Sequence, residues 1–489
     1  MADPGVDPRR LGDVFRRAGY TDAGIAAVLG LGDLLGVLDA DPRTLLGHAA
    51  GTDPACHLVR TFVLGLPLAR ATAERLLAPV PLAAWMRIGV LRDRGDIVEP
   101  TVRLVPFQDL WITSDLPSGS GPEAIAADYV MGPGRSSLTL ASLTVRQPCR
   151  AVLDVGTGSG VLALRAAAHA AQVVGVDRVA RATRFACFNR WLNRIPNFAI
   201  VRGDLAAAFG RDAFDLVVMN APFVITPEAR YAFRDGDRPI DGLCRTLVQS
   251  VPTVLAEGGI CQILCHWAHV DGAGWQARVA EWCAGTDCDA WALRFETMPA
   301  GAYAAQWMPV GVGATPRIAA TMLGTWLAFL ERERIDAVTA GFLTLRRRAG
   351  GPHRVHARDA PTALTGGDGG EYVAQTIAAD DFLATADDAA LLAASFRVAP
   401  VTRLEPAWRP EGGAWHAGPA RLRLVAGLSY TAQVETAMAE VVARCDGTRP
   451  LEGVLAEVTD GWQGGREAII AAALPGVRDL VARGFLLPP

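Results

Sequence analysis

Segments typical of strands and helices alternate between residues 150 and 346. Short apolar runs predict strands at RAVLDV, QVVGVD, FAIVRGD, FDLVVMN, GICQILCHW, AWALRFE and GFLTLRR. Between them lie longer stretches with helical spacing, including GVLALRAAAHA, ARATRFACFNRWLN, DGLCRTLVQSVPTVLA and GTWLAFLERER. Alternation at this spacing is typical of a doubly wound, mainly parallel sheet. We therefore predict an α/β fold built on seven strands.

Further domains are expected on both sides of this sheet, because 489 residues exceed what one core usually supports. Before it, helical patterns lead into two extended runs around Pro106, with Thr21 as a candidate N-cap. After it, the polar, glycine-rich segment 351–373 indicates a boundary, and short amphipathic helices follow. We predict a helical, winged-helix-like domain over 1–120, the α/β domain over 121–350, and a linker plus a small winged-helix-like domain over 351–489.

Composition excludes several classes of function. The net charge of −4 disfavours nucleic-acid binding by the winged-helix-like modules, which we expect to serve as substrate lids or dimer contacts instead. No apolar run approaches the ~20 residues of a membrane span, and the first residues lack the apolar core of a signal peptide. Nine scattered cysteines favour reduced thiols, so we expect a cytoplasmic protein. The absence of lysine excludes Schiff-base catalysis and a Walker-type phosphate site.

The glycine-rich stretch LDVGTGSGVLAL lies where the first predicted strand passes into a helix. Its glycines allow a sharp turn and a close approach by a ligand, and the helix start offers free N–H groups. The G-x-G-x-G spacing differs from the dinucleotide pattern, which requires glycine where Val161 stands. The candidate cofactor-binding residues of this stretch are Asp154, Gly156, Thr157, Gly158 and Gly160.

Acidic residues end the next two predicted strands. Asp177 closes VVGVD, where a carboxylate can accept hydrogen bonds from both hydroxyls of a ribose. Asp204 in RGDL follows the third strand and can accept from an adenine amino group. Their neighbours Arg178 and Leu205 complete the candidate cofactor site.

The fourth predicted strand, FDLVVM, has an uninterrupted apolar run, which is typical of a strand buried on both faces. It is followed directly by Asn220, Ala221, Pro222 and Phe223, a poor sequence for continuing a strand. The Asn220 side chain and the Ala221 carbonyl can accept hydrogen bonds, and the ring of Phe223 can form an apolar wall.

Together these stretches resemble a class I S-adenosylmethionine-dependent methyltransferase over residues 128–346. LDVGTGSG resembles the first motif of that family, GVD the second, and RGDL the motif on the adenine side. NAPF resembles the Asn-Pro-Pro-Tyr/Phe motif of amino-group methyltransferases, with Ala221 where proline is usual. DYVMGPGRSSLTLASLTVR, NAPFVITP and YAFRDGD are similar to actinobacterial relatives of the release-factor glutamine methyltransferases.

The resemblance implies a Rossmann-like methyltransferase sheet, S-adenosylmethionine as cofactor and S-adenosylhomocysteine as product. It also implies that the segment before the first strand covers the cofactor, through Gly132, Gly134, Thr139 and Thr144. It implies N-methylation of a small metabolite or peptide by a catalytic loop of Asn220, Ala221, Pro222 and Phe223, in which Asn220 and a neighbouring carbonyl hold the acceptor. The alternatives are methylation of a protein glutamine or a nucleobase amino group, O-methylation of a natural product, or a regulator that binds the cofactor without catalysis.

Weaker candidates for the substrate site follow the catalytic loop. Tyr231, Arg234, Asp235 and Asp237 lie in the charged stretch YAFRDGDRPIDG, for which a solvated connecting loop is the alternative. His266 and Trp267 follow the apolar part of the fifth strand, where packing is the alternative. We expect no metal site, because Cys261 and Cys265 on one strand lie too far apart to bind one zinc at ~2.3 Å.

The C-terminal segment VVARCDGTRPLEGVLAEVTDGW is similar to peptide-recognition domains of the pyrroloquinoline quinone pathway and to winged helices appended to other enzymes. A functional resemblance of the first kind implies an edge strand near residues 420–425 that pairs with a peptide. A dimerisation or structural role is the favoured alternative. We thus expect a small-molecule or peptide substrate, a homodimer as one option, and neither nucleic acid nor membrane as a partner.

Overall fold

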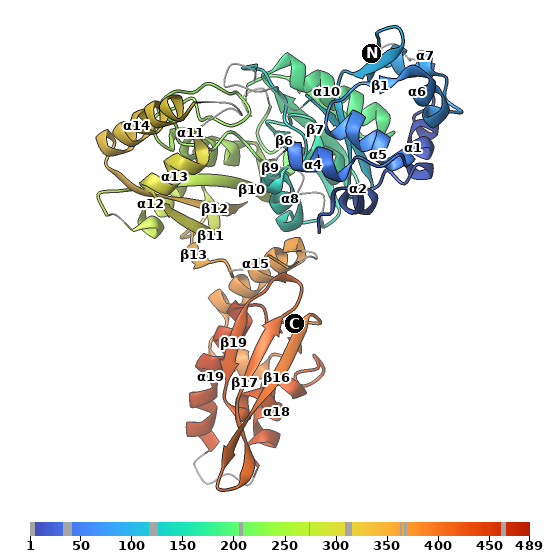
Figure 1. Cartoon of the computed structure of the whole chain (residues 1–489). Coiled ribbons are helices and arrows are strands. Elements are labelled where there is room, and N and C mark those ends of the chain that lie inside the picture. Colours follow the sequence, from blue (N-terminus) through green and yellow to red (C-terminus); the bar gives the residue numbers. More distant parts are fainter. Residues whose placement is uncertain are drawn as a thin grey trace. The chain divides into compact units, whose positions relative to one another are not determined.

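The computed structural model describes residues 5–32, 42–116, 126–204, 209–272, 274–308, 315–361, 364–365, 369–460 and 466–489. The chain divides into two compact units (Figure 1). The first comprises residues 1–141 and 148–358, and the second residues 142–147 and 359–489. The predicted division near residue 120 stays a prediction. No helix in the described residues combines the length and apolar character needed to cross a membrane.

A mixed sheet forms the centre of the first unit, with strand order β13-β11-β12-β10-β9-β6-β7-β8. Five neighbouring strands are parallel: β6 (Cys149–Val155), β7 (Ala170–Asp177), β8 (Phe198–Arg202), β9 (Phe214–Met219) and β10 (Leu255–Val270). β12 (Ile335–Arg347) runs antiparallel to β10 and to β11 (Cys288–Pro299). The predicted α/β sheet is therefore confirmed. The uninterrupted apolar run of β9 follows from its central place between β6 and β10.

The prediction of seven strands was wrong by one. An eighth strand, β13 (Val355–Asp359), lies at the edge of the sheet, within the stretch predicted to be a linker. Its sequence, VHARD, is polar and only partly buried. An edge strand has one neighbour and little apolar burial, so it lacks the pattern that identifies central strands.

Helices pack on this sheet in the predicted places: α9 (Val161–Ala166), α10 (Ala180–Leu192), α11 (Gly242–Ser250) and α14 (Pro316–Arg332). The structure adds α8 (Arg135–Leu143), α12 (Trp275–Cys283) and α13 (Ala300–Trp307), which were not predicted. Leu247 of α11 and Trp282 of α12 join Val217 and Ile263 of the sheet in one buried core. Apolar burial of this extent is the main stabilising term of the unit.

The described residues between 5 and 114, which are 5–32 and 42–114, form a helical layer with short strands. The helices are α1 (Pro8–Arg17), α2 (Asp22–Leu29), α4 (Pro42–His48), α5 (Pro54–Leu58), the π-helix η1 (Val59–Val63), α6 (Arg70–Leu77) and α7 (Leu82–Arg87). The strands are β1 (Leu68–Ala69), β2 (Leu91–Asp93), β3 (Ile97–Pro100), β4 (Arg103–Phe107) and β5 (Leu110–Ser114). Phe15, Phe62 and Trp85 are fully buried in its core. The predicted Thr21 cap is confirmed, since its side chain accepts from the Gly24 N–H. The winged-helix interpretation stays a prediction.

This layer is joined to the central sheet through strand β5 and helix α10. The Asn189 side chain accepts from the Thr113 backbone and hydroxyl at 2.8 and 2.6 Å and donates to the Thr113 carbonyl. Asn193 makes a matching pair of bonds with the Trp111 backbone. Buried polar groups that are fully paired in this way hold one geometry, so the chain leaving β5 is well positioned.

The second unit combines a three-stranded sheet with helices. Its helices are α15 (Gly369–Thr385), α16 (Asp388–Ala393), α17 (Thr436–Arg444), α18 (Leu451–Val458) and α19 (Arg466–Ala482). Strands β16 (Thr402–Glu411), β17 (Ala414–Leu424) and β19 (Thr431–Val434) pair in the order β16-β17-β19. Two-residue strands form separate pairs: β14 (Leu364–Thr365) with β18 (Gly427–Leu428), and β15 (Arg397–Val398) with β20 (Leu486–Leu487).

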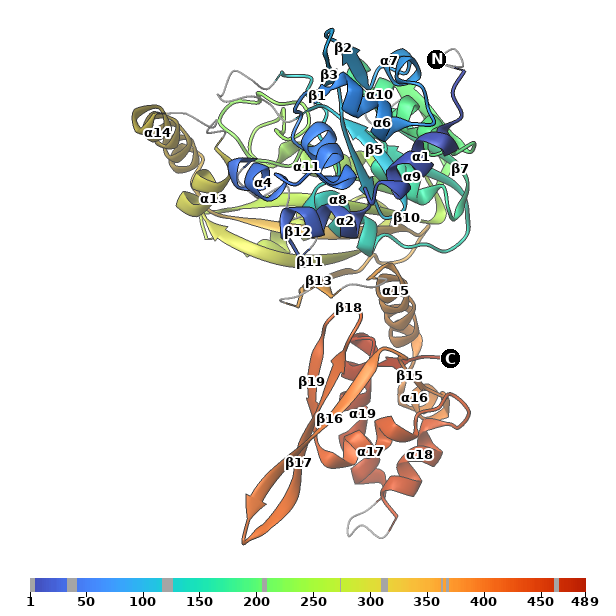
Figure 2. The same ribbon diagram turned by 45° about the vertical axis from the view of Figure 1, so that its right-hand side comes forward.

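The prediction of a free edge strand near residues 420–425 was wrong. Residues 420–424 belong to β17, the middle strand, which pairs with β16 on one side and β19 on the other. The far end of the β16–β17 hairpin extends past the helices of its own unit (Figure 2). Trp408 and Trp415 on the hairpin are 58% and 67% exposed.

Candidate active site

Three glycines shape the turn between β6 and α9. Gly156, Gly158 and Gly160 have φ angles of +72°, +55° and +87°, a region that side chains other than glycine rarely adopt. The N–H groups of Gly156 and Thr157 donate to the Val176 carbonyl, which ties the turn to β7. The glycine pattern therefore has the conformational cause that the sequence suggested.

Asp154, near the end of β6, stabilises this turn through hydrogen bonds. It is 1% exposed and accepts from the Thr157 hydroxyl at 2.7 Å and from the Ala163 N–H at 3.1 Å. Burial raises the pKa of this carboxyl to about 7. Asp154 and Gly160 do not border the cavity described next, whereas the other glycines and Thr157 do.

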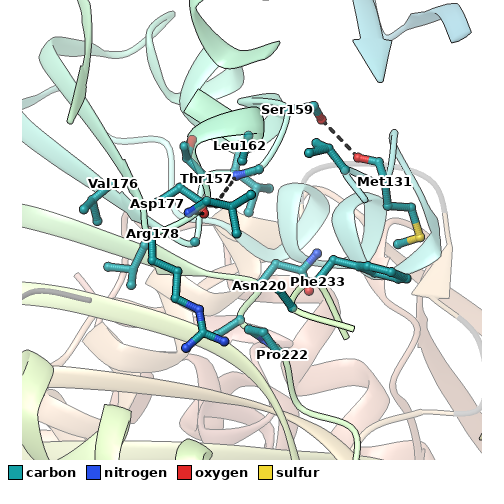
Figure 3. A pocket seen from close by; sticks show the side chains of 18 of the residues that line it. Met131, Thr157, Ser159, Leu162, Val176, Asp177, Arg178, Asn220, Pro222 and Phe233 are labelled. Atoms are coloured by element: carbon teal, nitrogen blue, oxygen red, sulfur yellow. Dashed lines mark hydrogen bonds between the residues drawn. The ribbon is translucent and has the colours of Figure 1, made fainter. Parts of the chain in front are cut away.

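A cavity opens above the turn, at the carboxyl ends of the parallel strands (Figure 3). Ligands of open α/β sheets bind at this edge. The lining comes from four parts of the chain: the segment before α8, the turn after β6, the ends of β7 and β8, and the stretch from Asn220 to Leu243. Its side chains include Tyr129, Met131, Ser137, Thr157, Leu162, Asp177, Arg178, Asp204, Asn220, Pro222, Phe233, Asp237 and Arg238.

Asp177 borders the cavity from the end of β7. Its carboxylate accepts from the Gly158 N–H at 2.9 Å and from the Val179 N–H at 2.8 Å, while partial burial raises its pKa. A carboxylate has about four acceptor sites, so two such bonds leave capacity for hydroxyls of a ligand. Asp204 also borders the cavity and is exposed. Leu205 lies outside the described residues.

Arg178 lines the cavity but is already paired. Its guanidinium donates to the Asp237 carboxylate at 2.7 Å. Asp237 belongs to the segment before α11, so this ion pair joins two different parts of the cavity wall.

Asn220 follows β9 and is held by helix α8. Its Nδ2 donates to the Ser136 hydroxyl at 3.1 Å and to the Ser137 hydroxyl at 3.3 Å. Its Oδ1 is buried and has no hydrogen-bond partner among the described residues. Ala221 and Pro222 also line the cavity, and the predicted loop is thereby brought beside the glycine turn.

Phe223, the fourth residue of the predicted loop, does not line the cavity. Its ring packs against His266 with the ring centroids 4.5 Å apart, and against Trp307 at 6.3 Å. Phe233 borders the cavity instead. Phe233 belongs to the stretch YAFRDGD, whereas the prediction of Phe223 rested on its position close to Asn220 in NAPF.

Three of the predicted substrate residues after the loop stabilise their own segment. Asp235 is 1% exposed and accepts from the N–H groups of Arg230 and Tyr231, both at 2.9 Å. Arg234 donates to Asp235 at 2.7 Å, and its guanidinium lies over the Tyr231 ring. None of Tyr231, Arg234 and Asp235 borders the cavity. This compact turn presents Ala232 and Phe233 to the cavity.

His266 and Trp267 are buried and do not line the cavity. The Tyr303 hydroxyl accepts from the Ile225 N–H at 2.9 Å and lies within hydrogen-bond distance of His266 Nδ1, at 3.0 Å. Burial lowers the pKa of His266 to about 3, so its ring is neutral. Trp267 stacks on Trp275 with centroids 5.6 Å apart. His266 and Trp267 therefore pack in the interior, and the prediction that they contact the substrate is not supported by the cavity lining.

The segment before α8 covers part of the cavity. Tyr129, Val130, Met131 and Gly132 line it, whereas Gly134, Thr139 and Thr144 do not. Asp115, which follows β5, accepts from the Val130 N–H at 2.8 Å and pairs with Arg181 of α10. The helical layer thus determines where this wall lies. Ser137, Met131 and Phe233 were missed although their stretches resemble those of a family, because the resemblance did not indicate which side chains of these stretches face a ligand.

The two cysteines of β10 are buried thiols. Cys261 and Cys265 have their pKa raised by burial, which keeps both protonated. The described residues contain no group of three or more His, Cys, Asp or Glu side chains arranged for a metal ion.

Comparisons with known proteins agree with this geometry. A family model described as "Methyltransferase small domain" matches residues 134–266, and one described as "Domain of unknown function (DUF7782)" matches residues 374–488. Release factor glutamine methyltransferase of Escherichia coli (strain K12) is 28% identical over 188 residues, covering 38% of this chain and 60% of that protein. Its counterpart in Thermodesulfovibrio yellowstonii is 35% identical over 79 residues, covering 16% and 28%.

The chain thus spans 60% or less of these two curated relatives. The solved structure of M. jannaschii TYW2 in complex with AdoMet is 11% identical, covers 51% of this chain and 90% of that chain, and has a TM-score of 0.31. The fold assignment rests on the strand order itself. Residues 134–266 form a class I methyltransferase domain, with S-adenosylmethionine as its cofactor, that is distantly related to the release factor glutamine methyltransferases.

Proposed function

We propose that this chain transfers a methyl group from S-adenosylmethionine to a nitrogen of a small metabolite or peptide, with an uncharged amide as the preferred acceptor group. The single observation that carries the choice of nitrogen is the Asn220 side chain. Asn220 lines the cavity, and its buried Oδ1 is an acceptor without a partner among the described residues. A buried acceptor left unpaired costs about 1–3 kcal/mol, which a bound N–H group would recover.

The residues present fit S-adenosylmethionine. A Cβ built on Gly156 or Gly158 meets no atom closer than 3.9 Å, so it would project into open space at the cavity. Glycine at these two positions leaves that space free for a ligand. Asp177 offers acceptor capacity for ribose hydroxyls, and Asp204 for an exocyclic amine. When bound, the cofactor supplies an electrophilic methyl group on a positively charged sulfur.

The protein's own contribution is to position the acceptor and to exclude water. An amide nitrogen is a poor nucleophile, so it must be held in line and its protons must face acceptors. Asn220 Oδ1 and the Ala221 carbonyl are the acceptors we assign to this task. Phe233, Met131 and Leu162 provide an apolar wall. In place of the predicted Phe223, we assign the aromatic contact to Phe233.

A protein glutamine is the second candidate acceptor. The names of the curated relatives support it, since several of them are release factor glutamine methyltransferases. A side-chain amide of glutamine also has the uncharged N–H groups that Asn220 Oδ1 requires.

Methyl transfer from tritiated S-adenosylmethionine tests the proposal. The acceptors are a short peptide with one glutamine, the same peptide with glutamate, and free glutamine. We expect label on the amides and none on the glutamate peptide, because a carboxylate has no N–H group. Label on both peptides, or cofactor binding without transfer to any amide, would overturn the assignment to amide nitrogen. Absence of cofactor binding in calorimetry would overturn the enzyme proposal as a whole.

A further inference from the structure

Two charged side chains join opposite parts of the cavity wall. Arg178 follows Asp177 at the end of β7, and Asp237 lies in the segment between the Asn220 loop and α11. They form an ion pair of 2.7 Å and are 45% and 40% exposed. Both residues line the cavity, and Figure 3 shows Arg178 at its wall. The pair therefore connects the wall at the end of β7, where Asp177 is proposed to bind the ribose, to the wall formed by the segment after the Asn220 loop.

The segment 231–241 is anchored at both ends, and the ion pair holds the part between them. At its start, Val224 N–H donates to the Arg234 carbonyl at 3.0 Å, and Gly236 N–H donates to the Val224 carbonyl at 3.1 Å. At its end, the buried Asp241 accepts from the Ala268 N–H at 2.9 Å and pairs with Arg278. The buried Asp235 fastens the turn from inside. Beyond Gly236 the exposed Asp237 and Arg238 border the cavity. The Arg178–Asp237 ion pair thus links this segment to the end of β7.

With the wall in this position, the proposed acceptor site is closed. Asn220 Oδ1 is essentially inaccessible to water and has no partner among the described residues. A substrate N–H group cannot reach an atom that water does not reach, so part of the wall has to move before the acceptor binds. The segment around Asp237 is held by a partly exposed ion pair, which is weaker than the buried contacts of the other walls.

We propose, on the basis of the function proposed above, that residues 237–240 form a lid between the anchored Gly236 and Asp241, and that the Arg178–Asp237 ion pair is its latch. Cofactor exchange and access to Asn220 Oδ1 then require this pair to break. Arg178 and Asp237 are positioning residues in this role, since they hold the wall and take no part in methyl transfer.

Release of S-adenosylhomocysteine, followed by stopped-flow fluorescence, tests the latch without an acceptor. The variants are Arg178→Asp, Asp237→Arg and the double variant with both charges exchanged. We expect each single variant to release the ligand about fivefold faster, because removing a partly exposed pair is worth about 1 kcal/mol. The double variant should recover most of the wild-type rate. Added salt should speed release from the wild type, by screening the attraction, and slow it in the single variants, in which like charges face each other.

Arg94→Asp is the matched control. It removes the Arg94–Glu99 pair, which has an N–O distance of 2.8 Å and exposures of 49% and 38%, similar to those of the latch. This pair lies on the helical layer, so release should not change. Thermal unfolding of every variant checks that the fold is intact.

Release rates and salt dependence that match the wild type in both single variants would overturn the latch. Faster release in Arg178→Asp alone, without recovery in the double variant, would also overturn it and assign Arg178 to direct contact with the ligand. If the wild-type chain does not bind S-adenosylhomocysteine, the proposed function fails. If it binds with unchanged rates in the variants, only the latch fails.

Discussion

The Gly158 N–H group donates a 2.9 Å hydrogen bond to the Asp177 carboxylate, so the turn after β6 and the end of β7 share one bond. The second oxygen of Asp177 accepts from the Val179 N–H at 2.8 Å. The carboxylate proposed to bind the ribose therefore also fixes the turn above which the cofactor would lie. Loss of this one side chain removes both effects.

Asp177→Ala should weaken binding of S-adenosylmethionine by at least tenfold. Hydrogen bonds to a charged group are worth about 1.5–3 kcal/mol, and the variant also frees the Gly158 turn. Isothermal titration calorimetry measures the dissociation constant. Asp204→Ala is the comparison, with a smaller loss expected because Asp204 is exposed. An unchanged dissociation constant in Asp177→Ala would remove Asp177 from the cofactor site.

Asn220→Ala should lower turnover by at least 100-fold while the cofactor dissociation constant stays within about twofold. The side chain holds the acceptor in this proposal, and removal of one positioned polar group typically costs on the order of 10²–10³ in rate. The tritium assay and calorimetry measure the two quantities. Turnover that equals the wild type would exclude Asn220 from the mechanism.

Replacing both Ser136 and Ser137 by alanine should lower turnover by about tenfold. Their hydroxyls accept from Asn220 Nδ2, so without them the amide is free to rotate and its Oδ1 is no longer held. Cofactor affinity should change little. Thr139→Ala, on the same helix but away from the cavity, is the control. Serine-to-threonine variants keep the hydroxyls and should retain most of the activity; loss of activity there would point to packing instead.

Phe223 and Phe233 should respond differently to replacement by alanine. Phe223 packs against His266 and Trp307, so Phe223→Ala should lower the thermal midpoint by several degrees. Phe233 borders the cavity, so Phe233→Ala should leave the midpoint within about two degrees and weaken ligand binding. Differential scanning fluorimetry and calorimetry together separate the two. The reverse outcome would return the aromatic contact to Phe223.

The burial of Asp154 predicts a dependence of stability on pH. Its pKa is raised to about 7 in the folded chain, whereas an aspartate in an unfolded chain has a pKa near 3.9. Between these values the folded state holds a proton that the unfolded state lacks. The stability contributed by this group is therefore complete below about pH 4 and is lost as pH rises through about 7, at up to ~1.4 kcal/mol per pH unit.

Asp154→Asn isolates this effect, because asparagine does not titrate. The thermal midpoint of the variant minus that of the wild type should increase from pH 4 to pH 7 and level off above. A difference that stays constant over this range would show that Asp154 is ionised in the folded chain.

The sequence by itself determined the elements whose signal is local. Leu216 to Met219 form an uninterrupted apolar run, and the chain indeed builds a central strand there. Gly156, Gly158 and Gly160 have the left-handed backbone that their spacing implied. Because each parallel strand ends at the same edge of the sheet, the order of these motifs was enough to place Asp177 and Asn220 around one cavity.

Only the tertiary structure decided which side chains complete that cavity. Ser136 reaches Asn220 across 84 positions of sequence, and Arg178 reaches Asp237 across 59. Neighbouring residues also diverge: Phe223 turns into an aromatic cluster, while Phe233, from a turn fastened by the buried Asp235, borders the cavity. Side-chain direction and pairing in such loops depend on packing between distant segments, which no local pattern of residues encodes.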